Sequence, residues 1–294
     1  MIWVSWRQHR GEAIGSLGLL GALAVLLVLV SAPMRTAFSH DGVAACLARG
    51  DVSGCPGAID PFMNRFGLDF NQLLAVLLLI PGLIGVVVGS PLLAREFEHG
   101  TWRMAWSQTI PRTRWLAIKL GLVTGGLVLI GAAMTAVFTW YRSPMDRLTG
   151  RLGSAAFDFE GMTLTASLLC AFAVAVLAGL LMRRSVGAMV TAFFAWAAIR
   201  GVAEFWLRPR LLPPLVLRLP QSARTHFGPN VVPPMTGHLG DWIIGVTTTA
   251  RAQLVSYQPA SRFWSFQLIE SSLYLVLAAA ALGAAVWLLH RRAA

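Results

Sequence analysis

Charged side chains at or inside the ends of long apolar runs are the residues best placed to do chemistry in this sequence. They are Glu12, Glu160, Arg200, Glu204 and Glu270. Ionisable groups inside a bilayer are costly and commonly functional. Arg200 and Glu204 are four residues apart, so they would share one helix face. Two interpretations stay open for this pair: mutual neutralisation near an interface, or a part in substrate passage or gating. Glu270 would either reach an interface or hold a neighbouring segment.

The three cysteines offer a second kind of chemistry. Cys170 lies inside an apolar run and is most simply a packing residue. Cys46 and Cys55 share one polar loop, where an oxidising compartment would permit a disulfide, although two free thiols are the alternative. The sequence has no CxxC or HExxH motif, and we therefore predict no metal site.

Long apolar runs position these groups. The sequence is 56% hydrophobic and 13% charged, about half the charge usual in soluble domains. Each run approaches or exceeds the roughly 20 residues that a helix needs to cross a bilayer. We therefore predict an all-α integral membrane protein with six transmembrane helices in one permease-like domain, over residues 13–32, 70–94, 115–140, 162–182, 185–206 and 266–289.

The placement of arginine predicts the orientation of these helices. The net charge is +11, but the arginines flank the apolar runs and form no soluble basic face, which excludes a nucleic-acid partner. Short segments dense in arginine favour the cytoplasm. They place both termini and residues 95–114 inside, and the longer loops 34–69 and 208–265 outside.

Proline and glycine mark the run 70–94. Pro81-Gly82 and Pro91 should kink it or open its hydrogen-bond ladder. Gly85 and Gly89 are spaced for close helix packing, as are Gly121 and Gly125. Packing within the chain is the interpretation we favour, and a seam between two copies is the alternative.

The segment from Arg95 to Lys119 differs from every other connection. It reads REFEHGTWRMAWSQTIPRTRWLAIK, and its apolar residues recur at helical spacing. Trp102 and Trp106 form a second apolar strip, four residues apart. We predict an amphipathic helix on the cytoplasmic surface that ends near Pro111. A helix that only anchors the ends of two spans is the alternative.

This segment resembles the cytoplasmic loop of type-2 permeases of the ATP-binding cassette (ABC) exporters. In that family an acidic pair and Gly-Thr follow the second span, and a proline, a basic residue and a lysine precede the third. The stretches MIWVSWRQHR and YQPASRFWSFQLIE also resemble actinobacterial permeases. The matching positions in this sequence are Glu96 and Glu98, Gly100 and Thr101, Pro111, Arg114 and Lys119.

The resemblance implies a mechanism. Two permeases pair in the bacterial cytoplasmic membrane, as a homodimer or heterodimer, and each docks a separate ATPase that binds ATP and Mg. Short helices in the outer loop 208–265 would dip into the membrane. This sequence has no GxxxxGK[ST] loop, so ATP hydrolysis is expected on the partner and not on this chain, which is not expected to be an enzyme or to bind a cofactor. The implied ATPase-coupling residues are Arg95, Glu96, Phe97, Glu98, Gly100, Thr101, Trp102, Trp106, Pro111 and Arg114.

Three other classes of function are alternatives to a permease. A self-sufficient transporter or channel would carry polar groups in mid-span, and the apolar runs hold almost none. A membrane enzyme would need a convergent catalytic set, and no GxSxG or HExxH motif is present. A sensor or immunity protein on the same fold is a further alternative, because fold does not fix function.

Overall fold

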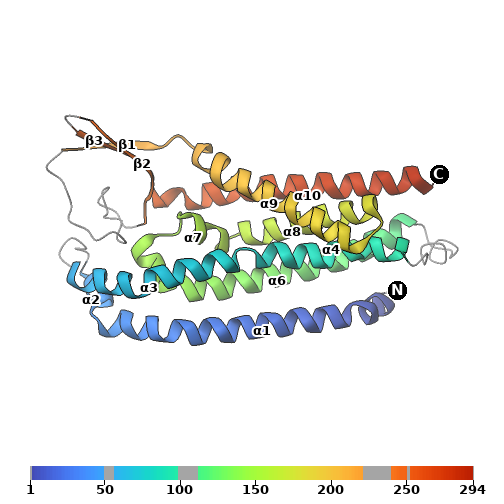
Figure 1. Cartoon of the computed structure of the whole chain (residues 1–294), viewed down its shortest axis with the longest axis horizontal. Helices are drawn as coiled ribbons and strands as arrows, with labels where there is room; N and C mark the ends of the chain where they lie inside the picture. Colours follow the sequence, from blue (N-terminus) through green and yellow to red (C-terminus); the bar gives the residue numbers. More distant parts are fainter. Residues whose placement is uncertain (1, 50–55, 99–111, 221–239, 250–251, 294) are drawn as a thin grey trace.

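The computed structural model describes residues 2–49, 56–98, 112–220, 240–249 and 252–293. Figure 1 shows long helices side by side, with both termini at one end of the bundle and a small sheet at the other. Within the described residues, five helices are long and apolar enough to cross a membrane, and Ile80–Arg95 is a shorter apolar helix. The chain is therefore a mostly helical, multi-pass membrane protein, while the count of six spans stays a prediction.

The long helices cover five of the predicted runs. They are α1 (Ile2–His40), α6 (Arg112–Thr149), α8 (Thr163–Met182), α9 (Ser185–Gly201) and α10 (Phe263–Ala293). A π-helical turn, η1 (Val202–Leu207), extends α9, and a short 3-10 turn, η2 (Arg208–Arg210), follows it. The short helices α2 (Val43–Ala48) and α7 (Ser154–Phe159) lie at the end remote from the termini (Figure 1).

The predicted run 70–94 is divided between two helices, α3 (Pro56–Leu77) and α4 (Ile80–Glu98). Pro81 has no N–H, so the carbonyl of Leu77 loses its usual donor four residues on. The helix restarts where the amide of Leu83 donates to the carbonyl oxygen of Leu79 at 3.0 Å. The break thus lies where Pro81 was expected to open the ladder, and the span is two helices in place of one.

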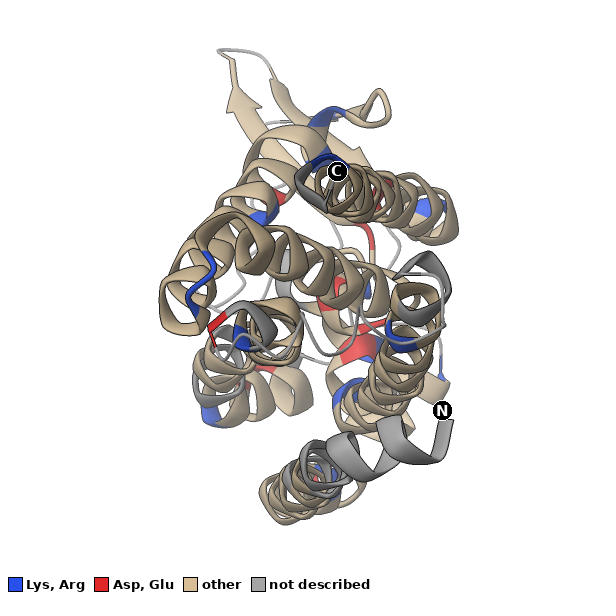
Figure 2. Ribbon diagram, turned by 90° about the vertical axis from the view of Figure 1, so that its right-hand side faces the viewer, with Lys and Arg blue, Asp and Glu red and all other residues tan. Residues whose placement is uncertain are grey.

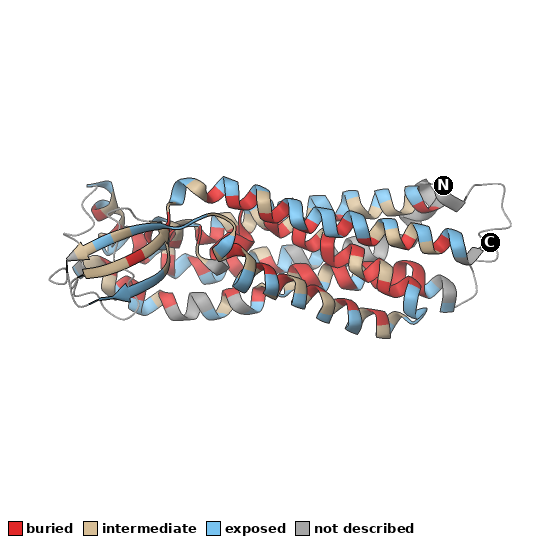
Figure 3. Cartoon of the chain, turned by 90° about the horizontal axis from the view of Figure 1, so that it is seen from above, coloured by how far each residue is buried: buried red, intermediate tan, exposed pale blue. Residues whose placement is uncertain are grey.

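Helix α8 is the centre of the bundle. It packs against α4, α6, α9 and α10, and 72% of its apolar window is buried, against 17–33% for the other four candidate spans (Figure 3). Glycine permits the closest of these contacts. A Cβ at Gly85 would lie 2.6 Å from the carbonyl oxygen of Leu168, and one at Gly89 would lie 2.6 Å from that of Phe172. These two glycines therefore serve packing within the chain.

The loop 208–265 corrects the all-α prediction, because its described residues include a three-stranded sheet besides two short 3-10 turns. Strands β1 (Leu215–Pro220), β2 (Trp242–Thr248) and β3 (Ala252–Gln258) are antiparallel in the order β1-β3-β2. Leu217 pairs with Val255, and the register of β2 shifts between Ile243 and Gly245. Aromatic and β-branched residues in β2 favour a strand.

Replacing Gly85 or Gly89 by leucine should lower stability. The new side chain would meet the backbone of α8, and overpacking of this kind costs roughly 1–3 kcal/mol. Leucine at Gly121 or Gly125 is the matched control, because no described atom lies within 4 Å of a Cβ at either position. Thermal unfolding of the purified proteins in one detergent measures the difference. An equal loss at all four positions would contradict the assigned α4–α8 contact.

Candidate functional site

The end of the bundle that carries both termini contains an unusual helix cap. Helix α9 has no side-chain cap of its own. Glu98, the last residue of α4, supplies one: its Oε1 accepts from the amide of Ser185 at 2.8 Å and its Oε2 from the hydroxyl of Ser185 at 2.5 Å. A carboxylate is favourable at a helix N-terminus. Glu98 therefore joins the start of the predicted coupling segment to the first residue of α9.

Lys119 makes a second connection at the same end. Its Nζ donates to the carbonyl oxygen of Leu92 at 3.0 Å, which ties α6 to the last turns of α4. The two helices that flank the coupling segment are thus joined to each other, and one is joined to α9. A displacement of this segment would act on three membrane helices at once.

The predicted coupling residues divide into two groups. Arg95, Glu96, Phe97 and Glu98 continue α4, so the predicted surface helix does not begin at Arg95, which corrects that boundary. Arg114 lies in the first turn of α6. Their contacts with an ATPase stay predictions. The remaining members lie outside the described residues: Gly100, Thr101, Trp102, Trp106 and Pro111.

The opposite end encloses a network of charges centred on Arg208. The side chain of Arg208 is 1% exposed. Its Nε and Nη2 donate to the two carboxylate oxygens of Glu270 at 2.8 and 2.7 Å, and Nη2 also lies 2.5 Å from Oδ1 of Asp158. Arg208 also stacks on the ring of Phe157 at 4.3 Å. The bidentate pair with Glu270 joins η2 to α10, and the contact with Asp158 joins η2 to α7.

Arg200 completes this network from α9. Its Nη2 lies 2.6 Å from Oδ2 of Asp158 but 3.5 Å from Oε2 of Glu204. Arg200 and Glu204 do share a face, as predicted, yet the closer partner of Arg200 is Asp158. Arg200 and Arg208 are eight positions apart, more than two α-helical turns. The wider π-helical turn between them lets both guanidinium groups reach Asp158.

A second charged cluster lies beside the first. Arg142 Nη2 contacts Oδ1 of Asp146 at 2.7 Å, and Arg151 Nε pairs with Oε2 of the fully buried Glu160. Glu160 was expected at a span end, and the structure places it between two arginines. In Figure 2 most of the ribbon carries no Lys, Arg, Asp or Glu. Both clusters involve α7 or its neighbours, in the part of the bundle remote from the termini (Figure 1).

Gln267 holds the turn that carries these carboxylates. Its Oε1 accepts from the amide and the hydroxyl of Thr163, at 3.0 and 2.7 Å, and its Nε2 donates to the carbonyl of Phe157 at 2.9 Å. Gly161 has φ of +68°, and a Cβ there would lie 2.7 Å from the same Oε1. Gln267 therefore caps α8 from α10, as Glu98 caps α9 from α4.

The sequence analysis missed Asp158, Arg142, Arg151 and the role of Arg208, the first residue of the predicted outer loop 208–265. Arg208 is 50 residues from Asp158 and 62 from Glu270, so no local spacing reveals the contact. A carboxylate in an apolar segment, such as Asp158 between Phe157 and Phe159, was the one available signal. Of the predicted gating group, the structure brings Arg200, Glu204 and Glu270 into one region.

The cysteines are partly described. Cys46 is buried and disulfide-bonded, whereas Cys170 is buried and free. Cys55 lies outside the described residues, so its pairing with Cys46 stays a prediction. Within the described ranges, no group of three or more His, Cys, Asp or Glu side chains could hold a metal ion.

These features define a multi-pass helical membrane protein. At one end, Lys119 and Glu98 connect the helices that flank the predicted coupling segment. At the other end, buried charges form ion pairs. A family model described as "ABC-2 membrane transporter related" matches residues 17–208. The match covers more than half of the chain, which therefore belongs to this family and is an ABC-2 type permease. Comparisons with curated proteins and with solved structures give no match.

Replacing Arg208 by alanine should destabilise the protein strongly. The change leaves Asp158 and Glu270 buried without their main counter-charge, and breaking a buried pair in this way costs roughly 3–5 kcal/mol. The matched control is Arg210→Ala: Arg210 is exposed and donates to the carbonyl of Trp206. Thermal unfolding in detergent should show a large loss only for Arg208→Ala. Equal stability of the two variants would contradict the network.

Proposed function

We propose that this chain is the membrane subunit of an ATP-driven ABC exporter, in which it forms the substrate pathway with a second permease copy. A separate cytoplasmic ABC ATPase docks on the segment 95–114. The observation that carries this proposal is the family match over residues 17–208, which includes that segment and the spans on both sides of it. The membrane is the bacterial cytoplasmic membrane, with both termini on the ATPase side.

The contacts at the two ends of α9 support a route by which a movement of the ATPase would reach the far end of the bundle. Glu98 couples the end of α4 to Ser185, at the start of α9. The other end of α9 carries Arg200, which binds Asp158 in the buried network. A helix rises about 1.5 Å per residue, so these contacts are roughly 23 Å apart along α9. Movement of the ATPase would therefore reach the far end through one rigid helix.

The carboxylates of the coupling segment have separate roles in this proposal. Glu98 is engaged by Ser185 and sets the position of the segment. Glu96, Trp102 and Trp106 contact the ATPase. The two tryptophans supply most of the binding energy, since aromatic side chains commonly contribute about 2 kcal/mol or more at an interface. ATP and Mg bind to the ATPase, and this chain supplies no catalytic group.

Co-purification tests the proposal. Tagged chain from its own host should bring down a stoichiometric ATPase, identified by mass spectrometry through its phosphate-binding loop. The double variant Glu96→Arg, Glu98→Arg should lose it. Ser185→Ala removes the hydroxyl hydrogen bond to Glu98 but keeps the backbone amide that also donates to it, leaves the charge of the segment unchanged, and should retain the ATPase. Asp41→Arg reverses an exposed acid in the loop at the other end and is the charge control.

Two outcomes would contradict the proposal. One is a well-folded native chain that brings down no ATPase from its own host. The other is an unchanged yield of ATPase with the double variant, which would move the docking surface away from residues 95–114. Loss of the ATPase with Ser185→Ala would show that the α4–α9 contact, and not the charge of the segment, governs docking.

A further inference from the structure

The buried network around Arg208 contains one more acid than it has arginines. Its two cations are Arg200 and Arg208, and its three acids are Asp158, Glu204 and Glu270. None of the five side chains is more than 12% exposed. Among the described residues, every ion pair of these acids is made with one of the two arginines. Full ionisation would therefore leave one negative charge without a counter-charge inside the bundle.

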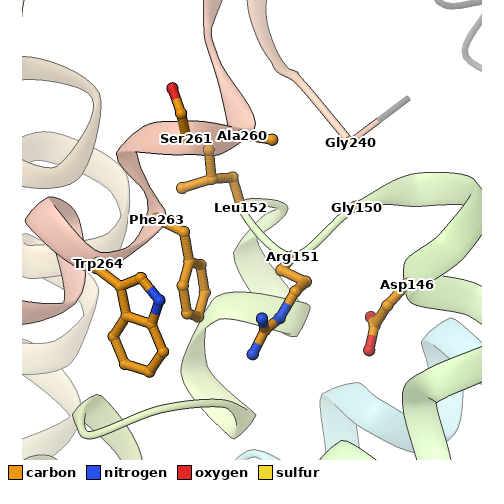
Figure 4. Close-up of a pocket in the computed structure, with 9 residues that line it drawn as sticks. All are labelled: Asp146, Gly150, Arg151, Leu152, Gly240, Ala260, Ser261, Phe263 and Trp264. Carbon is orange, nitrogen blue, oxygen red and sulfur yellow. The ribbon is translucent and has the colours of Figure 1, made fainter. Parts of the chain in front are cut away.

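The neighbouring cluster is balanced, with two charges of each sign. In this cluster Arg142 and Arg151 pair with Asp146 and Glu160. Asp146 and Arg151 also line a cavity of about 270 Å³ beside the base of the sheet, and Figure 4 shows Arg151 between Phe263 and Asp146. No member of the Arg208 network lines this cavity or the one of about 470 Å³ between α6, α8 and α10. The uncompensated charge thus lies away from both cavities, which favours a ligand that needs no cavity.

Glu204 is the acid of the Arg208 network with the weakest pairing. Asp158 accepts from Arg200 at 2.6 Å and from Arg208 at 2.5 Å, and Glu270 accepts from Arg208 through both carboxylate oxygens. Glu204 lies 3.5 Å from Nη2 of Arg200, the same nitrogen that contacts Asp158. The charges that act on Glu204 come from all four of these residues, in α7, α9, η2 and α10. The uncompensated charge therefore falls on Glu204.

The hydroxyl of Tyr274 is a second unsatisfied group at this place. It is buried and has no hydrogen-bond partner among the described residues. Tyr274 lies one turn after Glu270 on α10 and interacts electrostatically with Glu270 and Asp158. It also packs in one cluster with Ala203, the residue before Glu204. Since a buried hydroxyl without a partner is costly, its presence indicates that a further polar group or ligand completes the network.

A proton is the ligand that removes the uncompensated charge. An ionised carboxylate that is buried without a partner takes up a proton, because burial disfavours its charged form. A protonated carboxyl group is also a hydrogen-bond donor, and the Tyr274 oxygen on α10 offers it an acceptor. A metal ion does not fit this place, since the acids of the described residues form no group that could hold one.

We propose that Glu204 binds a proton and thereby controls the partner of Arg200. With the proton bound, Glu204 is neutral and Arg200 pairs with Asp158, which joins α9 to α7. Loss of the proton to water at the sheet end of the bundle leaves Glu204 as a carboxylate, which draws Arg200 back to its own helix. The link between α9 and α7 is therefore closed when the proton is bound and weakened when it is released. The proposal does not depend on the ATPase, so it and the proposed function fail independently.

Infrared difference spectroscopy of the purified chain tests this site, with the proton as the ligand. Raising the pH from about 6 to about 10, in a detergent without carbonyl groups, should remove one carboxylic-acid carbonyl band from the native spectrum, since buried carboxyl groups titrate in this range. Glu204→Gln should lack this change. Asp41→Asn removes an exposed acid at the same end of the bundle and is the matched control, which should keep the change.

Thermal unfolding in the same detergent separates the unpaired acid from a paired one. A proton that is held by the folded chain but not by the unfolded chain makes stability fall as the pH rises. Glu204→Gln should therefore match the native chain at about pH 4, where a free glutamate titrates, and should exceed its stability increasingly as the pH rises. Asp146→Asn leaves the buried Arg142 without its closest acid and should lower the melting temperature near neutral pH.

Amide hydrogen exchange tests the change of partner by Arg200. The protection of α7, corrected for the intrinsic exchange rate, should fall in the native chain as the pH rises through the range of the infrared change. The protection should stay constant in Glu204→Gln. Helix α2, at the same end of the bundle, is the internal reference and should keep its protection in both chains.

Three outcomes would overturn the proposal. The absence of a titrating carbonyl band, or its persistence in Glu204→Gln, would mean that Glu204 is ionised or that another acid holds the proton. A loss of stability with Glu204→Gln near neutral pH would make Glu204 an ionised partner of Arg200. The same change in the protection of α7 in both chains would remove the change of partner by Arg200.

Discussion

Hydrocarbon offers no partner to a charge or to a backbone amide, and the structure is organised around satisfying such groups internally. Arg208 is the clearest case: it is almost fully buried, and two carboxylates and an aromatic ring enclose it. To make these contacts, α7, α10 and the extension of α9 must meet at one point. The π-helical turn before Arg208 follows from the same requirement, since it brings Arg200 and Arg208 to one carboxylate.

The need to satisfy backbone amides within the protein also explains how the N-termini of α8 and α9 are capped. Neither α8 nor α9 carries a side-chain cap of its own. Gln267 from α10 and Glu98 from α4 provide the missing acceptors. Capping from a neighbouring helix ties the position of one helix to that of another. In a permease this gives each end of the bundle a defined connection, one toward the predicted ATPase surface and one toward the sheet.

The helices were largely predictable from the sequence, because apolar runs of about 20 residues are typical of membrane-spanning helices. The run 162–182 coincides closely with α8. The sheet was not predictable from the same reasoning, since β1 and β2 are separated by 21 residues, far more than a hairpin turn, and both pair with β3 (Pro220 and Trp242 bound the gap). The ion pairs of Arg208 join residues 50 and 62 positions apart, and only the fold brings them together.

Photo-crosslinking in intact cells tests the central claim that an ATPase docks at the end of the bundle where both termini lie. A photoreactive phenylalanine analogue replaces Trp106 in one variant and Trp264, at the start of α10 beside the sheet, in another. The account predicts that the first variant crosslinks to a protein with a phosphate-binding loop and that the second does not. No such crosslink from the position of Trp106, or the same crosslink from both positions, would contradict it.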